Sequence, residues 1–245
     1  MNTSQDVTAE ELARDHYRTQ QTLAAAAAVQ AQQAWKQIDS RNISASWQSL
    51  LALFMRFLVG FQAQAARDGD VYVRRIARAA GSVPDPIGTV VPDMFAGIAS
   101  DGRDLETLLQ TPLIGVFRDI GGGAPPDQAL QSGMGDLVTI VATQVADAGR
   151  VATGLSMVND RGISGYVRIV NLPACGRCII LAGREYSWST GFARHPRCLR
   201  LHHETTNPGR VGFPRSRHGP SRVVRPDVSG AASEGVHRAR CSGDP

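Results

Sequence analysis

The stretch from Ser44 to Ala80, SASWQSLLALFMRFLVGFQAQAARDGDVYVRRIARAA, decides the fold class. Its apolar side chains recur at three- and four-residue steps, the spacing that places them on one face of an α-helix. We interpret this face as the core of a helix bundle, with a partner-binding face as the alternative. The triplet Asp68-Gly69-Asp70 is a candidate for a kink or a break in the helix. The apolar face begins with Trp47, Leu50, Leu51, Phe54, Phe57, Leu58 and Phe61.

Three further segments have helical patterns. Thr8 and Glu11 form a capping-box pattern at the start of the first, and its alanine run has high helix propensity. Pro112 should bend the start of the second. The apolar stripe of the third runs from Leu130 to Leu155. The segments are 8–38, 105–120 and 125–158, and a loop over 83–101 separates the first pair of helices from the rest.

Three of the four cysteines lie close together near residue 190. Cys175 and Cys178 form a C-x-x-C, and His195 and Cys198 form an H-x-x-C after a gap of sixteen residues. Two such pairs supply the four soft or borderline ligands that tetrahedral zinc prefers. We expect Ile179 and its apolar neighbours to form one arm of a small β-hairpin tied by the metal, as in a zinc ribbon. A redox pair or a C-x-x-C without metal are the alternatives.

This stretch also resembles a known family. YVRIVNLPACGRCIILAGREY, residues 166–186, followed by GFARHPRC, residues 191–198, is similar to the C-terminal signature of the phage Mu F-like minor head proteins. The likeness is strongest to the actinobacterial-phage branch of this head-morphogenesis family, and IDSRNISASW, residues 38–47, is similar to its N-terminal part. The resemblance implies a minor capsid protein of the virion, assembled in the host cytoplasm, whose partners are the portal or other capsid proteins.

The resemblance ends at Cys198. The family signature continues as C-D-C, whereas this chain has Cys198-Leu199-Arg200-Leu201. A one-base shift in permitted codons restores C-D-C, and the same shift over 223–245 can give an amphipathic helical sequence similar to the family's continuation. We therefore interpret residues 199–245 as translated out of frame. The zinc site would then lack one natural ligand, with His195, His202 or His203 as possible replacements.

The predicted fold class is mainly α, in three parts. Residues 1–160 form a helical body, and residues 161–198 form a cysteine-rich β/zinc-knuckle module. Residues 199–245 are rich in Arg, Pro, Gly and Ser without apolar periodicity, so we expect a disordered tail.

Charge and hydropathy limit the partners that we expect. Residues 1–198 hold 18 basic and 18 acidic residues, so the excess of the net charge of +4 lies in the tail. A basic nucleic-acid surface is therefore not predicted in the body. The most hydrophobic run, Leu50 to Phe61, contains Arg56 and is too short to span a bilayer. We expect no signal peptide and no membrane partner.

Three functions fit these features. The first is a structural minor head protein with structural zinc. The second is a capsid maturation protease, for which Ser156, His16 and Glu185 are weak candidates because no nucleophile motif surrounds the serine. The third is a zinc-dependent DNA-binding accessory protein. Its phosphate contacts would be Arg177, Arg184, Arg194 and Arg197 around the cysteines.

Overall fold

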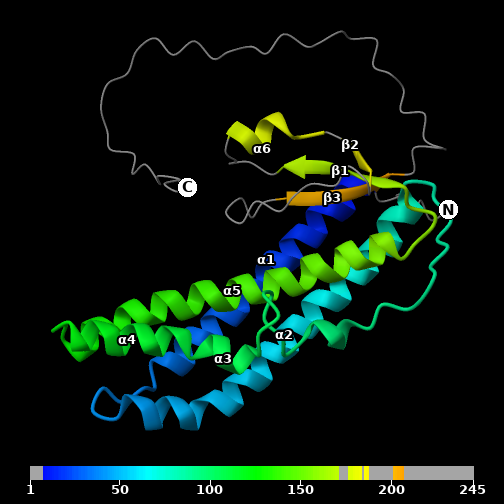
Figure 1. Ribbon diagram of the computed structural model, residues 1–245. Helices are drawn as coiled ribbons and strands as arrows, with labels where there is room; N and C mark the ends of the chain where they lie inside the picture. Colours follow the sequence, from blue (N-terminus) through cyan, green and yellow to red (C-terminus); the bar gives the residue numbers. More distant parts are fainter. Residues whose placement is uncertain (1–7, 171–175, 184, 188–200, 207–245) are drawn as a thin grey trace, which may run out of the picture. The chain divides into compact units, whose positions relative to one another are not determined.

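A computed structural model describes residues 8–170, 176–183, 185–187 and 201–206. These residues are mainly helical, as the sequence predicted. The helical elements are α1 (Ala9–Trp35), α2 (Ile43–Ala79), η1 (Pro92–Phe95), α3 (Leu105–Leu109), α4 (Thr111–Gly121), α5 (Pro126–Val158) and α6 (Gly176–Ile180). The long helices α1, α2 and α5 are followed along the chain by a small β-sheet (Figure 1).

Helix α1 begins with the predicted capping box. The backbone N–H of Glu11 donates to Thr8 Oγ1 at 3.2 Å, and the backbone N–H of Thr8 donates to Glu11 Oε2 at 2.8 Å. Each of these two hydrogen bonds gives a partner to a backbone N–H that the helix itself leaves unbonded. The buried face of α1 is largely alanine, which lets its backbone approach the neighbouring helices closely.

Helix α2 runs without a break through Asp68-Gly69-Asp70, so the triplet does not divide the helix. Both aspartates have partners on other elements, and Gly69 packs against α5. The buried stripe of α2 includes Trp47, Leu51, Phe54 and Leu58, all at most 3% exposed. Phe57 was predicted in this stripe but is 47% exposed.

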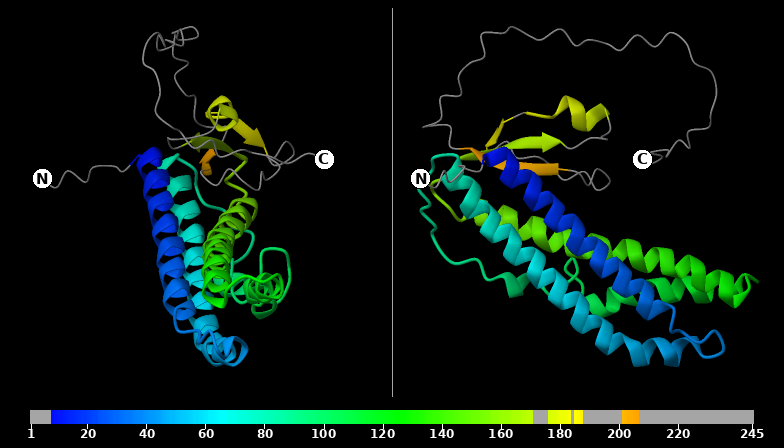
Figure 2. Two further views of the ribbon diagram at one scale, coloured as in Figure 1. Left: turned by 90° about the vertical axis from the view of Figure 1, so that its left-hand side faces the viewer. Right: turned by 180° about the vertical axis from the view of Figure 1, so that it is seen from behind.

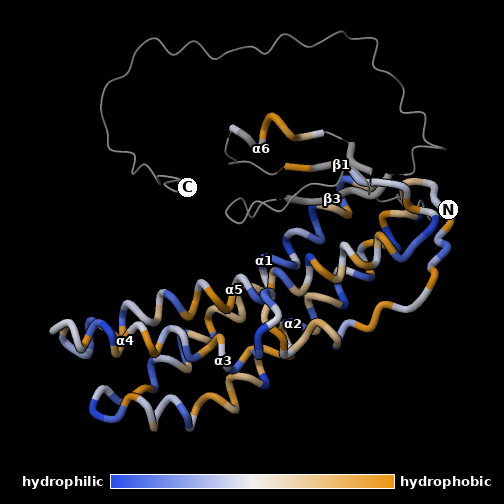
Figure 3. The backbone as a smooth tube through the Cα atoms, viewed as in Figure 1, coloured by the Kyte–Doolittle hydropathy of each residue, from blue (hydrophilic) through white to orange (hydrophobic). Residues whose placement is uncertain are grey.

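The three long helices run side by side (Figure 2). Contacts between Trp35 and Trp47 at one end and between His16 and Tyr72 at the other show that α1 is antiparallel to α2. Asp70 of α2 contacts Ser156 of α5, and Ser82 just after α2 contacts Gly162 just after α5, so α2 and α5 are parallel. Figure 3 shows apolar residues recurring along each helix, as expected for a bundle core.

The predicted helix over 105–120 is divided into α3 and α4 at Gln110. Pro112 lies in the first turn of α4, where its missing N–H costs nothing. Helix α5 buries Leu137, Val141 and Val145 as predicted. Its C-terminal part departs from the prediction, because Leu155 is 47% exposed and Ser156 is 5% exposed.

A three-stranded antiparallel sheet follows the helices, in the order β2-β1-β3. Its strands are β1 (Gly165–Val170), β2 (Glu185–Ser187) and β3 (Leu201–Thr206). Tyr166 is paired with Tyr186 of β2, and Ile169 with His202 of β3. Tyr166 and Ile169 also pack against an apolar cluster at the ends of α2 and α5 that contains Tyr72, Val73, Ile76 and Met157.

Two predictions for this part of the chain were wrong. Ile179 and Ile180, expected in a hairpin arm, lie in α6, and the hairpin partner of β1 is β2. Residues 201–206 were expected to be disordered but form β3, where pairing with β1 gives partners to the backbone groups along one edge of the strand. The rest of 199–245 lies outside the described residues.

Within the described part of the chain, α2 alone is long and apolar enough to cross a membrane by length and composition. This differs from the prediction based on Leu50 to Phe61, because the apolar window extends beyond that run. Of this window, 39% is buried inside the protein. Core helices pass the same test, and the stripe from Trp47 to Leu58 packs in the core.

Candidate functional site

The predicted zinc ligands lie mostly outside the described residues. Cys178 lies on α6, whereas Cys175, His195 and Cys198 are outside the described ranges. The backbone order β1, then C-x-x-C at the start of α6, then β2 places this motif between two paired strands. Among the residues that the structure describes, no group of three His, Cys, Asp or Glu side chains could hold a metal. The zinc site therefore stays a prediction.

The predicted phosphate contacts around the cysteines also lie mostly outside the described residues. Arg177 lies on α6, and Arg184, Arg194 and Arg197 are outside the described residues. A DNA-binding role for this cluster also stays a prediction.

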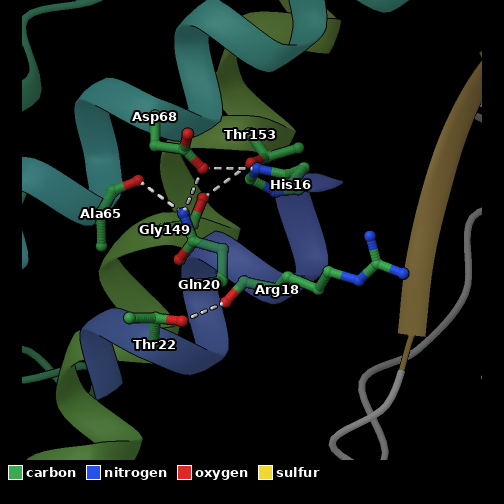
Figure 4. Close-up of polar contacts among 8 residues, drawn as sticks. All are labelled: His16, Arg18, Gln20, Thr22, Ala65, Asp68, Gly149 and Thr153. Carbon is green, nitrogen blue, oxygen red and sulfur yellow. Dashed lines mark hydrogen bonds and ion pairs between the residues drawn. The ribbon is translucent and has the colours of Figure 1, made fainter. Parts of the chain in front are cut away.

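The described residues contain a polar layer between α1, α2 and α5 that the sequence did not reveal. We define the polar layer as His16, Gln20, Asp68, Asp70, Thr153 and Ser156. Nδ1 of His16 lies 2.6 Å from Oδ2 of Asp68, and the side chains are only 11% and 28% exposed. The His16 ring stacks on Tyr72 with centroids 4.0 Å apart. The layer thus joins α1 to α2 through the His16–Asp68 contact (Figure 4) and through the stacking of His16 on Tyr72.

Gln20 extends the polar layer toward α5. Its Nε2 donates to Asp68 Oδ2 at 2.9 Å and to the carbonyl oxygen of Ala65 at 3.0 Å (Figure 4). The amide lies against Gly149, where an added Cβ would overlap it. Its buried Oε1 has no hydrogen-bond partner among the described residues. Glycine at 149 therefore leaves room for the end of the Gln20 side chain, which an added Cβ would displace.

The α2–α5 contact of the polar layer is built on Asp70. Ser156 Oγ donates to Asp70 Oδ1 at 2.9 Å, and the guanidinium of Arg74 pairs with the other carboxylate oxygen. An added Cβ at the neighbouring Gly69 would lie 2.8 Å from the carbonyl oxygen of Gly149 and 2.6 Å from Thr153 Oγ1. The two helices are therefore close together at Gly69, and both carboxylate oxygens of Asp70 have partners.

The pKa of the Asp68 carboxyl is lowered. Burial by itself would raise this pKa, but hydrogen bonds from His16 and Gln20 outweigh it, assisted by the positive charge of Arg75. Asp68 is therefore ionised at neutral pH and acts as an acceptor for both of its neighbours.

These contacts bear on the protease candidates. The Ser156 hydroxyl is buried and donates to a carboxylate, whereas a serine nucleophile needs a general base to accept its proton. His16 is paired with Asp68, a different carboxylate. The polar layer therefore links helices and does not assemble Ser156, His16 and one acid into a triad arrangement.

Buried amides and one carboxylate fix the long loop between α2 and α3. Gln62 donates to the carbonyl of Ile98 at 3.1 Å and accepts from the N–H of Gly97 at 2.9 Å. Gln144 accepts from the N–H of Ser100 at 2.7 Å. Asp160 accepts from the N–H groups of Asp85 and Gly162. The backbone of the predicted loop is therefore hydrogen-bonded at several points to side chains of the helices and of the segment after α5.

Sequence reasoning missed the polar layer because its members are ordinary surface residue types in helical segments. Gly69 and Gly149 were the available signal, since glycine inside a helix lowers its stability and is kept for a packing reason.

Comparison with protein-family models, with curated proteins and with solved structures finds no match.

Proposed function

We propose that this chain is a minor capsid protein of the phage Mu F-like kind, acting in head morphogenesis. The observation that carries the proposal is the resemblance of residues 166–186 and 191–198 to the family's C-terminal signature. In this role the protein is structural, associates with the portal or other capsid proteins, and resides in the virion after assembly in the host cytoplasm.

The arrangement of the C-terminal elements supports a structural module. Strand β1, with which the similar stretch begins, packs through Tyr166 and Ile169 on the ends of α2 and α5. The strand β2 has only three residues, and α6 has five. Elements this short bury little apolar surface, so a metal crosslink would add stability that they lack. Cys175, Cys178 and Cys198 would supply zinc ligands, with His195 as the candidate for the fourth, and zinc would act there as a structural crosslink.

Catalysis is the less supported alternative. The buried Ser156 and the His16–Asp68 pair take part in separate contacts that hold helices together. A protease role would require another nucleophile or a rearrangement of the bundle.

The test is association with capsid components. Tagged protein is mixed with procapsids that contain portal and with procapsids that lack it, and the two are compared by sedimentation. We expect co-sedimentation with the portal-containing particles. The double variant Cys175→Ser/Cys178→Ser should lose it, whereas Cys241→Ser, a matched cysteine change in the tail, should not. Equal sedimentation with both particles, or with neither, would contradict the proposal.

A further inference from the structure

The exposed face of α2 carries only positive charge. Its cations form what we call the arginine stripe, Arg56, Arg67, Arg74, Arg75 and Arg78, all exposed. The two acids of α2, Asp68 and Asp70, face the polar layer, with side chains 28% and 12% exposed. The body is neutral as a whole, but this face is not.

The spacing places these side chains together. Arg56, Arg67 and Arg78 are separated by eleven residues each, close to three helical turns, so they lie on one face of α2. Arg74 is one turn from Arg78, and Arg75 is beside it. From Arg67 to Arg78 the helix rises about 16 Å, which matches about five phosphates of one strand of duplex DNA along its axis.

Among the described residues, three of these guanidinium groups make no hydrogen bond or ion pair. Arg67 pairs with the exposed Asp93 at 3.2 Å, and Arg74 pairs with Asp70. Arg56, Arg75 and Arg78 have no hydrogen bond or ion pair among the described residues. No described hydrogen bond or ion pair would have to be displaced for their N–H groups to bind an external anion, and the charge of Arg75 also acts on Asp68.

We propose that the arginine stripe of α2 binds the phosphate backbone of double-stranded DNA without reading its sequence. Arginine presents several N–H donors in a planar fork that matches phosphate oxygens. Binding of single strands would need exposed aromatic rings for base stacking. The stripe offers one exposed ring, Phe57 beside Arg56, because Tyr72, the aromatic residue between Arg67 and Arg78, is 5% exposed and stacked on His16. The stripe contains none of the predicted zinc ligands, and the proposal does not depend on the proposed capsid role.

The experiment measures fluorescence anisotropy of a labelled short duplex of arbitrary sequence with the full chain, between about 50 and 200 mM salt. In the variant Arg75→Gln/Arg78→Gln, loss of two phosphate contacts should reduce the slope of log K against log salt by about 1.8 and weaken binding at least about tenfold. Arg75→Lys/Arg78→Lys keeps both charges and should retain most of the slope. Helix content by circular dichroism verifies that each variant is folded.

The matched control is Lys36→Gln/Arg118→Gln, which removes two exposed cations outside the stripe. It should leave affinity and slope unchanged. Absence of duplex binding by the unmodified chain, an equal loss in the control, or no loss in the Gln variant would each overturn the proposal. Binding of poly-L-glutamate that is lost in the Gln variant, with duplex binding unchanged, would assign the stripe to an acidic protein and also overturn it.

Discussion

Nδ1 of His16 on α1 lies 2.6 Å from Oδ2 of Asp68 on α2, across 52 positions of sequence. The same carboxylate oxygen accepts from Gln20, and the His16 ring stacks on Tyr72 one turn further along α2. Two apolar helix faces can shift slightly along each other and remain packed. A buried charged group keeps its hydrogen bonds in only one relative position of the two helices. The pair therefore fixes how α1 lies along α2.

Removing one member of this pair should destabilise the fold. His16→Gln loses the contact to Asp68 and the ring stacking, so we expect unfolding free energy to fall by about 1–3 kcal/mol. Urea denaturation of the full chain measures it. The control is Arg14→Gln, also on α1, which breaks the exposed Arg14–Glu10 pair and should cost less than about 1 kcal/mol. Equal losses in the two variants would contradict the importance of the polar layer.

The lowered pKa of Asp68 predicts a pH dependence. The unfolded chain has the ordinary aspartate pKa of about 3.9 and the folded chain a lower one, so the stabilisation is fully present above that value. It is lost as the pH falls through the folded pKa, where protonation removes the acceptor for His16 and Gln20. The stability difference between the unmodified chain and Asp68→Asn should therefore shrink below about pH 4. A difference that stays constant between pH 5 and 2 would show that Asp68 does not titrate in this way.

Gly69 and Gly60 provide a test of helix packing within α2. Gly69→Ala places a Cβ against the backbone of Gly149, which cannot move away, so the loss should be about 1–3 kcal/mol. An added Cβ at Gly60 meets no atom within 4 Å, and Gly60→Ala should stabilise by up to about 1 kcal/mol through helix propensity. Thermal unfolding of both variants gives the comparison. Two stabilising changes would mean that α2 and α5 are further apart than the structure shows.

The helices were predictable because one property, the recurrence of apolar residues, reports on their buried faces. The stripe of Trp47, Leu51, Phe54 and Leu58 and the capping box at Thr8 are local signals of this kind. The polar layer was not predictable, since Asp68 and Asp70 looked like a helix break until their distant partners were known. Strand β3 was missed for a similar reason, because its support comes from pairing with β1 and not from its own composition.

Ser156 separates a structural from a catalytic interpretation. Ser156→Ala removes a donor to the buried Asp70 carboxylate and should lower unfolding free energy by about 1–3 kcal/mol. Any processing of scaffold or capsid proteins in assembling heads should continue unchanged, as gel electrophoresis would show. The control Ser132→Ala alters an exposed serine of α5 and should be near neutral in stability. Processing that stops in Ser156→Ala and persists in Ser132→Ala would establish catalysis.

The cysteine module gives the prediction that bears most directly on the capsid proposal. The chain as printed has three clustered cysteines and Arg200 where the family signature has the second cysteine of C-D-C, so we expect it to bind less than one zinc ion per chain. A chain in which a one-base shift after Cys198 restores C-D-C should bind about one, measured by elemental analysis of purified protein. Cys178→Ser should abolish zinc binding in both chains.

The control for zinc binding is Cys241→Ser, which should leave zinc content unchanged because this cysteine belongs to the tail. Sequencing of the gene across the codons for 195–203 decides whether the printed frame is genuine. If the frame is confirmed and the printed chain still binds zinc stoichiometrically, His195, His202 or His203 completes the site. The interpretation of a family signature broken at Cys198 would then be wrong, and the tail would have to be treated as part of the functional protein.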